Sequence, residues 1–370
     1  MERARAAVLG LWSVQGLGEV SFARIQEGVP DLGTLLDEPG FDWARPLGLS
    51  EKVLTLLEQG PRVAVLAERA LEAIARTKMS VAFPGDPAFP ARLASTADCP
   101  PVLYLVGPGA EGGARRRVAM VGTRAIDPDF LGVARRIAAQ VAASGVGVIS
   151  GAAQGVDTEC HLGALGARGE TWAFMGAGLD QLDPHQRSLG RAILEGGGTV
   201  FADFPPGTRP DKSTFPRRNR LISGSSDAVV FCRGDRKSGA MHTVRYAWDQ
   251  GRPVLAIPGE LGRRGSDGPN LVVREGRARL CLDAGDVLDA VGLADSISGA
   301  PEPAPRGGGV AQLTRWAQQA YEALRGDCVD FDELHARMGR PEAGAVMAAL
   351  VELELKDLVI QKPGRRFERI

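Results

Sequence analysis

The chain has few of the residues on which several classes of protein depend. Its five cysteines are odd in number and scattered, without a CxxC pair, which argues against structural zinc and against a disulfide framework. Its four histidines lack metal-ligand spacing. No apolar run approaches the ~20 residues of a membrane helix, and no small-residue cleavage site follows the first residues. These absences predict a cytoplasmic protein with no metal and no membrane partner.

Charge of one sign is not in excess either. The 44 Lys and Arg residues balance 45 Asp and Glu residues, and the formal net charge is −1. Bulk charge therefore gives no argument for a nucleic-acid partner, and a site for a polyanion has to come from a local patch. The chain does have length, because 370 residues with 44% hydrophobic content exceed one ordinary core and favour two or three domains.

Shifts in composition divide the chain into four parts. Residues 1–78 predict a helical domain of SAM or helix–hairpin–helix type, in which the turn Val14–Gly18 either binds DNA backbone or belongs to a module that only packs on its neighbour. Residues 81–296 predict a Rossmann-like domain. Residues 298–309, SGAPEPAPRGGG, form a Pro/Gly linker. Residues 311–370 predict three helices and two short strands, the outline of a winged helix.

The middle part alternates short apolar strands with amphipathic helices. This alternation predicts an α/β fold with a parallel sheet covered by helices on both faces. Ligands of such folds bind at the carboxyl ends of the strands, so the residues that follow each strand carry most of the functional interest. Strands are expected at 102–106, 118–121, 146–149, 172–175, 199–202, 228–231 and 253–257, and helices at 130–143, 158–167, 189–195, 220–223 and 242–250.

A glycine-bearing turn lies in the segment Val146–Leu165, VGVISGAAQGVDTECHLGAL. An expected strand enters this turn and an expected helix leaves it, so free N–H groups and the positive end of a helix dipole would suit a phosphate. Gly151 and Gly155 would let a bulky ligand approach the backbone closely. The alternative is a tight strand-to-helix connection without a ligand.

The strongest local charge lies between Asp211 and Arg245, where eight Lys and Arg residues stand against three Asp residues. Phe215 lies inside this basic run. Single-stranded nucleic acid requires cations that follow the phosphates and a ring that stacks on a base, and arginine can bind two phosphate oxygens. The alternative is a solvated basic loop with Phe215 in the core and with Asn219 and Arg220 holding the loop by hydrogen bonds.

Two further turns bring cations to the same edge of the expected sheet, Gly122–Arg124 and Lys237–Gly239. The residues expected to bind nucleic acid are Arg124, Gly151, Gly155, Lys212, Phe215, Arg217, Arg218, Asn219, Arg220, Lys237, Ser238 and Gly239.

Catalytic signals are weaker. Asp157 and His161 stand four residues apart on one expected helix and could form an acid–base pair, although a structural role for both is the more common outcome. A dinucleotide fingerprint and a Walker loop are absent. We therefore expect no catalytic residue and no cofactor.

Seven blocks in order resemble the DprA/Smf family of DNA-processing proteins. They are FPARLASTADCPPVLYLVG (89–107), VAMVGTR (118–124), SGAAQGVDTECHLGAL (150–165), FMGAGLD (174–180), FPRRNRLISG (215–224), KSGAMHT (237–243) and GRPVLAIPGE (251–260). The resemblance implies an extended Rossmann-like domain with a helical N-terminal domain and a C-terminal winged helix. It also implies a dimer that binds single-stranded DNA and loads RecA onto DNA taken up in natural transformation.

Residues of the family's site carry over by position. The resemblance puts its DNA-binding arginine at Arg124 and its lysine and stacking phenylalanine at Lys212 and Phe215. Its glycine turn falls on Gly151 and Gly155, and the arginines of the RNR block fall on Arg218 and Arg220.

The chain departs from the family's pattern at a few positions. Asp183 stands where a tyrosine is usual, Gln186 where an asparagine is common, and Gly276-Arg277 replaces a Gly-Ala. Between positions 331 and 353 of the expected winged helix, the chain has two arginines, Arg337 and Arg340, and four acidic residues. This balance of charge favours docking to a protein over reading DNA.

A competing class is a nucleotide-processing enzyme of the lysine-decarboxylase-like phosphoribohydrolase type. Members of that family carry a PGGxGTxxE motif, whereas Pro258–Gly262 reads PGELG here. A third possibility is a scaffold that docks RecA without binding DNA, against which the basic, aromatic-bearing run 212–220 argues.

Overall fold

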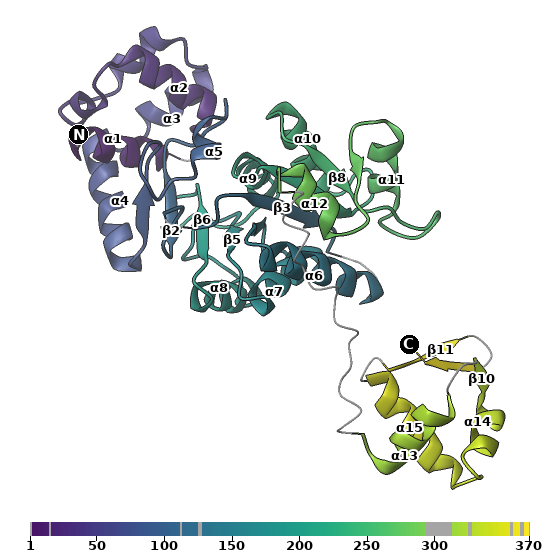
Figure 1. The fold of residues 1–370 in the computed structure, drawn as a ribbon. Coiled ribbons are helices and arrows are strands. Elements are labelled where there is room, and N and C mark those ends of the chain that lie inside the picture. Colours follow the sequence, from purple (N-terminus) through teal and green to yellow (C-terminus); the bar gives the residue numbers. More distant parts are fainter. Residues whose placement is uncertain are drawn as a thin grey trace. The chain divides into compact units, whose positions relative to one another are not determined.

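The computed structural model describes residues 2–14, 16–111, 113–124, 128–293, 313–324, 328–355, 358–362 and 366–369. The chain divides into two compact units, Met1–Ile297 and Ser298–Ile370 (Figure 1). The expected linker at 298–309 lies outside the described residues. Among the described residues, no helix combines the length and the apolar character needed to cross a membrane.

A nine-stranded sheet forms the centre of the first unit, in the order β1-β2-β6-β5-β4-β3-β7-β8-β9. From β6 to β9 in this order, each strand is parallel to the next one, which confirms the predicted α/β fold with a parallel sheet. At the other edge, β2 runs antiparallel to β6 and β1 runs antiparallel to β2. The strands span Ser80–Ala82 (β1), Leu103–Val106 (β2), Arg117–Gly122 (β3), Gly147–Ser150 (β4), Thr171–Phe174 (β5), Thr199–Ala202 (β6), Ala228–Arg233 (β7), Val254–Ala256 (β8) and Arg279–Leu280 (β9).

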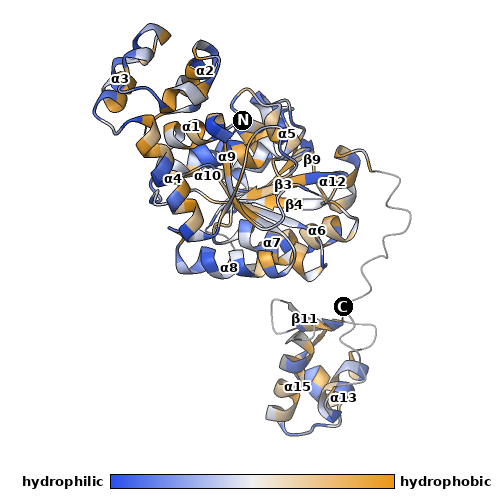
Figure 2. Ribbon diagram, turned by 90° about the vertical axis from the view of Figure 1, so that its left-hand side faces the viewer, coloured by the Kyte–Doolittle hydropathy of each residue, from blue (hydrophilic) through white to orange (hydrophobic). Residues whose placement is uncertain are grey.

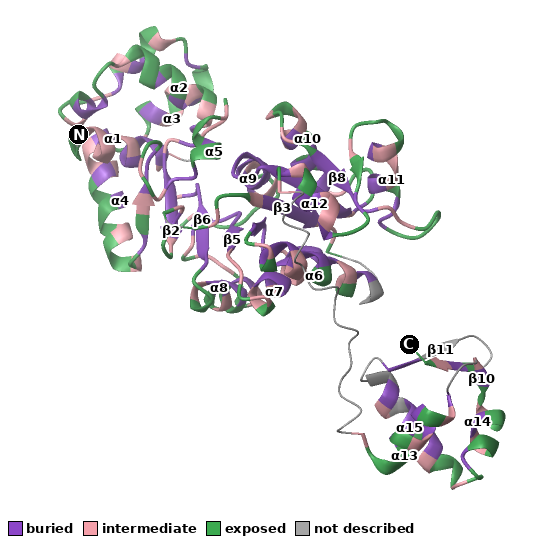
Figure 3. Ribbon diagram, viewed as in Figure 1, coloured by how far each residue is buried: buried purple, intermediate pink, exposed green. Residues whose placement is uncertain are grey.

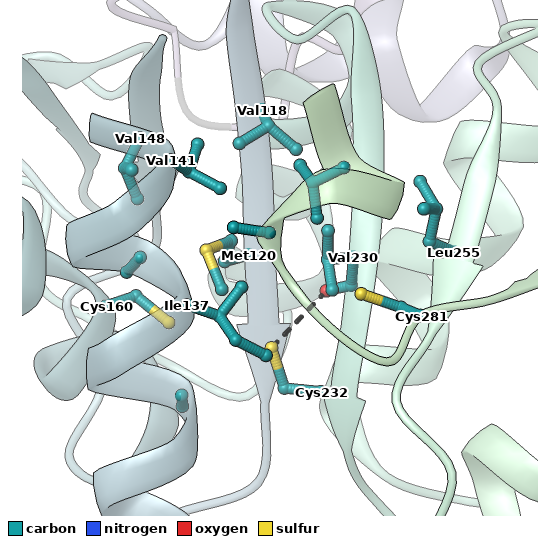
Figure 4. Packing of buried hydrophobic residues seen from close by; sticks show 14 of the residues in the cluster. Val118, Met120, Ile137, Val141, Val148, Cys160, Val230, Cys232, Leu255 and Cys281 are labelled. Atoms are coloured by element: carbon teal, nitrogen blue, oxygen red, sulfur yellow. Dashed lines mark hydrogen bonds between the residues drawn. The ribbon is translucent and has the colours of Figure 1, made fainter. Parts of the chain in front are cut away.

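Helices cover both faces of this sheet, and Figure 3 shows the strands buried between them. Along β3, Val118 and Met120 join one apolar cluster while Ala119 and Val121 join the other, because successive side chains of a strand point to opposite faces. Figure 4 shows the first cluster, to which Met120 of β3 and Cys160 both belong. One face carries α6 (Pro128–Ala143), α7 (Val156–Gly166), α8 (Pro184–Glu195) and α12 (Ala284–Ala290), and the other α5 (Ala91–Ala94), α9 (Thr214–Gly224), α10 (Gly239–Asp249) and α11 (Asp267–Arg274).

The N-terminal segment is helical and belongs to the same compact unit as the sheet. Its core includes Trp12, Phe22 and Leu57, and Tyr104 of β2 packs in the same cluster. Gln15, within the expected hairpin turn, lies outside the described residues. The helices are α1 (Glu2–Trp12), α2 (Glu19–Gly28), α3 (Glu51–Glu58) and α4 (Val63–Thr77), with 3₁₀ turns at Leu32–Leu36 and Asp42–Leu47.

The expected helix at 189–195 begins earlier, at Pro184. Asp183 accepts a hydrogen bond from the Gln186 backbone N–H at 2.8 Å, and the Gln186 side chain accepts one from the Asp183 N–H at 3.3 Å. This capping box satisfies two N–H groups that the helix start would leave free, and Pro184 suits the first turn. The two departures from the family pattern therefore act together as a helix start.

The second unit has the predicted outline of three helices followed by two strands. The helices are α13 (Arg315–Ala323), α14 (Phe331–Arg337) and α15 (Ala343–Leu355). The hairpin of β11 (Val359–Lys362) and β12 (Arg366–Arg369) gains a third strand, β10 (Val329–Asp330). Two residues are too few to show a periodicity, so no sequence pattern indicated β10.

Candidate nucleic-acid interface

A pocket of about 460 Å³ lies at the carboxyl edge of the sheet, where β3 and β7 end. The chain fills the sheet from β3 to β6 in one direction and then returns to place β7 on the other side of β3. Ligands of open α/β sheets bind at such a switch in strand order. The pocket is lined by Val121–Arg124, Ala153, Asp157, Phe215, Arg218, Asn219, Ile222, Asp235 and Lys237–Ala240 together with Thr243.

Arg124 and Phe215 meet at this pocket from different elements. Arg124 is exposed just after β3, and its guanidinium carbon lies 5.2 Å from the centre of the Phe215 ring. The ring is partly exposed in the first turn of α9 and packs beside Gly176 at the end of β5. A cation and a ring thus face the pocket together, as the sequence predicted for these two positions.

Lys212 is exposed immediately before α9. The Asp211 carboxylate accepts hydrogen bonds from the Ser213 hydroxyl and from the backbone N–H groups of Ser213 at 2.6 Å and Thr214 at 3.0 Å. These bonds lower the pKa of Asp211, and the bond from the Ser213 hydroxyl has the largest effect. The turn that presents Lys212 is therefore fixed by the carboxylate next to it. At this exposed position the ammonium group of Lys212 can contact a ligand.

The basic run itself is not a loop, which corrects the alternative considered from the sequence. Residues 214–224 form α9, in which Pro216 lies in the first turn, where proline is tolerated. The helix buries Arg218 and Arg220 and leaves Arg217 partly exposed.

Arg218 is only 4% exposed and forms part of the pocket wall. Its Nη1 donates to the carbonyl oxygens of Gly151, at 2.5 Å, and of Phe174, while Nε donates to Asn219 Oδ1 at 3.2 Å. Burial lowers the pKa of Arg218 to about 10, so it remains a cation at neutral pH. Arg218 therefore fastens α9 to the ends of β4 and β5, and its predicted role as an external phosphate contact needs correction.

Arg217 and Arg220 are also occupied inside the protein. Arg220 Nη2 lies 2.5 Å from both Glu19 Oε1 and Asp203 Oδ2, and Arg217 Nε lies 2.9 Å from the same Glu19 oxygen. Burial raises the pKa of Glu19, but Arg220 and Arg217 outweigh it, and the pKa lies below its usual value. This ion cluster joins α2 to α9, so neither arginine is placed to take a phosphate.

The glycine turn is occupied by a carboxylate of the chain itself. Asp157 accepts the N–H of Gly122 at 3.3 Å and that of Gly151 at 3.2 Å, so the expected free N–H of Gly151 is not free. Burial raises the pKa of Asp157, against the opposing effects of Arg218 and these N–H groups. Both glycines serve packing: a Cβ at Gly151 would lie 2.5 Å from Arg218 Nη1, and Gly155, at φ +87°, would put one 2.7 Å from Thr123 O.

Asp157 and His161 have separate partners. Thr171 Oγ1 donates to Val148 O at 2.8 Å, so at 2.7 Å it accepts from His161 Nδ1. His161 is fully buried, and burial lowers its pKa to about 3. A neutral imidazole held in the core supports the structural interpretation over an acid–base pair.

The third turn remains open to the pocket. Lys237 and Gly239 are exposed, and Ser238 begins α10 with extended backbone. The buried Ser238 hydroxyl oxygen has no hydrogen-bond partner among the described residues. A helix start with an unused hydroxyl suits an anion. Asn219 donates to Gly239 O at 3.1 Å and so helps position this turn instead of facing solvent.

Sequence reasoning missed Thr243 and Ile222 of the pocket lining. The sequence shows the helical spacing of these two residues. It does not show which face of α9 or α10 lies against the pocket, because that depends on the strand order. It also missed a second hollow, described below, to which α4 contributes.

A family model described as DNA recombination-mediator protein A matches residues 80–292. The chain belongs to this family. A second model, the DprA winged helix domain, matches residues 301–365. The resemblance inferred from the seven sequence blocks is therefore confirmed.

Curated relatives extend over most of the chain. A putative DNA processing protein DprA of Mycobacterium tuberculosis is 35% identical over 268 residues, 72% of this chain and 68% of its own length. The protein Smf of Escherichia coli is 31% identical over 279 residues, 75% of this chain and 74% of its own length.

Two solved structures of DNA processing protein A are similar. The Streptococcus pneumoniae protein has a TM-score of 0.57 at 26% identity, covering 75% of this chain and 95% of that one. The Helicobacter pylori protein, described with a single-stranded DNA binding mode, has a TM-score of 0.52 at 26% identity, covering 58% of this chain and 95% of that one.

Proposed function

We propose that this DNA recombination-mediator family member binds single-stranded DNA at the pocket between β3 and β7. The observation that carries the proposal is the meeting of exposed Arg124 with the partly exposed ring of Phe215 at this pocket, with exposed Lys212 three residues before that ring in the chain. Cations beside an aromatic ring provide phosphate contacts and a stacking platform. The single-stranded DNA binding mode described for the Helicobacter pylori relative supports the same class of ligand here.

The phosphate contacts are assigned to a smaller set than the sequence alone suggested. Arg124, Lys212 and Lys237 are exposed, and the start of α10 adds the unused Ser238 hydroxyl. Phe215 stacks on a base. Arg217, Arg218, Asn219 and Arg220 act behind this layer by holding α9 in place, and Gly151 and Gly155 allow the close packing of the turn.

The protein then acts by binding and not by catalysis. A strand whose phosphates are held along one edge of the protein keeps other bases accessible, which suits a mediator that protects single-stranded DNA and passes it to RecA. We propose that it works as a homodimer in the cytoplasm and serves DNA taken up in natural transformation. Membership of the recombination-mediator family supports this assignment.

The test is fluorescence anisotropy of labelled single-stranded and double-stranded oligonucleotides over a salt series. We expect single strands to bind more tightly, with a slope of log K against log salt of about −0.7 for each phosphate neutralised. Arg124→Ala and Lys212→Ala should each reduce that slope by about 0.7. If a variant with both substitutions kept its affinity for DNA, the pocket would not be the binding site. If the unmodified chain bound neither kind of DNA, the proposed function would be wrong.

RecA loading has its own readout. The protein should restore RecA filament formation on DNA coated with single-strand-binding protein, and the Lys212→Ala variant should not. If the unmodified protein and the Lys212→Ala variant were equally active, RecA loading would not depend on this pocket.

A further inference from the structure

A second hollow of about 820 Å³ lies between the N-terminal helices and the sheet. One wall comes from α1, α4 and the segment that follows Trp12, and the other from the proline-rich loop after β6. We call this hollow the α4 groove. Its lining is Trp12–Val14, Gly16, Leu17, Leu66, Arg69, Ala70, Ala73, Asp203–Asp211, Ser213, Thr214 and Arg217.

The α4 groove begins where the DNA pocket ends. Phe215 lines the pocket, while its neighbours Thr214 and Arg217 line the groove. The start of α9 is therefore a ridge between the two hollows, with exposed Lys212 just before it. A strand that stacks on Phe215 and contacts Lys212 has the groove directly in front of it.

Exposed arginines stand on both walls of the groove. Arg69 on α4 and Arg209 on the opposite loop are exposed, and neither forms an ion pair with a described residue. Arg62 and Arg76 lie seven residues before and after Arg69 and are also exposed. Seven residues are close to two helical turns, so Arg69 and Arg76 form a row along α4, and Arg62 lies immediately before the helix.

The acidic residues near the row differ in their positions. Glu68 and Glu72 project from the side of α4 away from Leu66 and Ala73, which line the groove. Glu72 still neighbours both arginines, because it lies three residues after Arg69 and four before Arg76. Asp203 is fully buried in the ion cluster, and Asp211 is engaged by Ser213 and Thr214. The exposed Lys and Arg residues of the groove lining itself are Arg69 and Arg209.

Both walls are fixed, so the groove is a formed surface. Trp12 Nε1 donates to Asp203 O at 2.6 Å, and Arg217 lies over the rings of Trp12 and Phe204. On the loop, Gly207 N–H donates to Asp180 at 2.8 Å.

We propose that the α4 groove is a second part of the single-stranded DNA path, in which the N-terminal helices take phosphates through Arg69 and Arg76 and the facing loop through Arg209. This inference rests on the proposed function, because it extends the same bound strand. Its occupant is the continuation of the strand held at Lys212 and Phe215, on the grounds of continuity with that site and of charge.

Oligonucleotide length separates this inference from the proposed function. We would measure the salt slope for oligothymidylates of about 6 and about 20 nucleotides, a range typical of single-strand sites. The double variant R69Q/R76Q should lower the slope for the long oligonucleotide by about 1.4, since each phosphate contact is worth about 0.7, and leave the short one unchanged. Lys52→Gln removes an exposed cation of α3 outside both hollows and is the matched control.

An unchanged slope of the R69Q/R76Q variant for the long oligonucleotide would overturn the inference and leave the row to another partner, such as an acidic protein, while the pocket still bound DNA. No binding of either length by the unmodified chain would instead overturn the proposed function. As a second measurement, photo-cross-linking with iododeoxyuridine near one end of the long oligonucleotide should label peptides from residues 63–77 or 203–213. The experiment is repeated with iododeoxyuridine at the other end of the oligonucleotide. If only pocket residues were labelled in both cases, the proposed path through the α4 groove would be wrong.

Discussion

The guanidinium of Arg124 and the ring of Phe215 lie 5.2 Å apart although 91 positions separate them in the chain. One residue follows β3 and the other begins α9, and the parallel sheet brings these ends together. A cation near an aromatic face is attracted by the ring's charge distribution. The pair holds the ring at the pocket while part of its surface stays exposed for a base.

The first prediction concerns this ring. Phe215→Leu should weaken binding of single-stranded oligonucleotides by about 1 to 3 kcal/mol, since that is the usual contribution of one stacked base, and should leave the salt slope unchanged because no phosphate contact is lost. Phe215→Tyr keeps the ring and should bind nearly as the unmodified chain does. Anisotropy titrations measure both quantities. A loss that is equal in the two variants would contradict stacking.

The second prediction separates structure from binding in the RNR block. Arg218→Met should lower the free energy of unfolding by about 1 to 3 kcal/mol, because it leaves the buried carbonyl groups of Gly151 and Phe174 without their donor. Lys212→Ala, at an exposed position, should change stability by less than about 0.5 kcal/mol. Chemical denaturation gives both values. If Arg218→Met lost DNA affinity but kept its stability, Arg218 would be a direct contact.

The third prediction concerns Gly155. An alanine there would combine φ +87° with a Cβ 2.7 Å from Thr123 O, so Gly155→Ala should destabilise the protein by about 1 to 3 kcal/mol. Gly132→Ala is the control: no heavy atom lies within 4 Å of its added Cβ, and within α6 alanine should be neutral or stabilising by up to about 1 kcal/mol. Thermal unfolding of the two variants should move in opposite directions. Equal behaviour would mean that the turn relaxes.

The fourth prediction is a pH dependence of stability. Burial lowers the pKa of His161 to about 3 from a usual 6.5, so the folded protein does not take up the proton that the unfolded chain binds. The stabilisation is complete above pH 6.5 and is lost as the pH falls from 6.5 towards 3, by up to about 1.4 kcal/mol per pH unit. The difference in unfolding free energy between the unmodified chain and His161→Gln should shrink over this range, and a constant difference would refute it. His242→Gln, at an exposed position, is the control.

The sequence was sufficient for seven of the nine strands of the sheet, because those strands are buried and therefore read as short apolar runs. It missed β1 and β9, which have only three and two residues and are partly or fully exposed. Six of the seven expected strands belong to the parallel part of the sheet, and β6 spans the predicted residues Thr199–Ala202. Figure 2 shows this apolar character in the middle of the unit. The start of α9 was missed because Pro216 and three arginines look like a loop when their partners are unknown.

The site was predictable only in part, for the same reason. The position of Arg124 follows from a strand end, and that of Lys212 from the basic run and the resemblance, both of which the sequence shows. The internal use of Arg220 depends on Glu19, 201 positions away, and that of Gly151 on the carboxylate of Asp157 in the next helix. Long-range pairing of charges leaves no periodic signal in the chain.

The ion cluster of Glu19 with Arg217 and Arg220 has a consequence for how this protein can be divided. A truncation that begins at residue 79 would keep the whole match to the family model, 80–292, but would strip Glu19 from two arginines and Trp12 from the face of Arg217. The helical segment is thus not an interchangeable attachment. Asp203 would remain beside both arginines, but at 3.9 Å from Arg217 Nε it is a more distant partner than Glu19 at 2.9 Å, so the loss would fall mainly on Arg217.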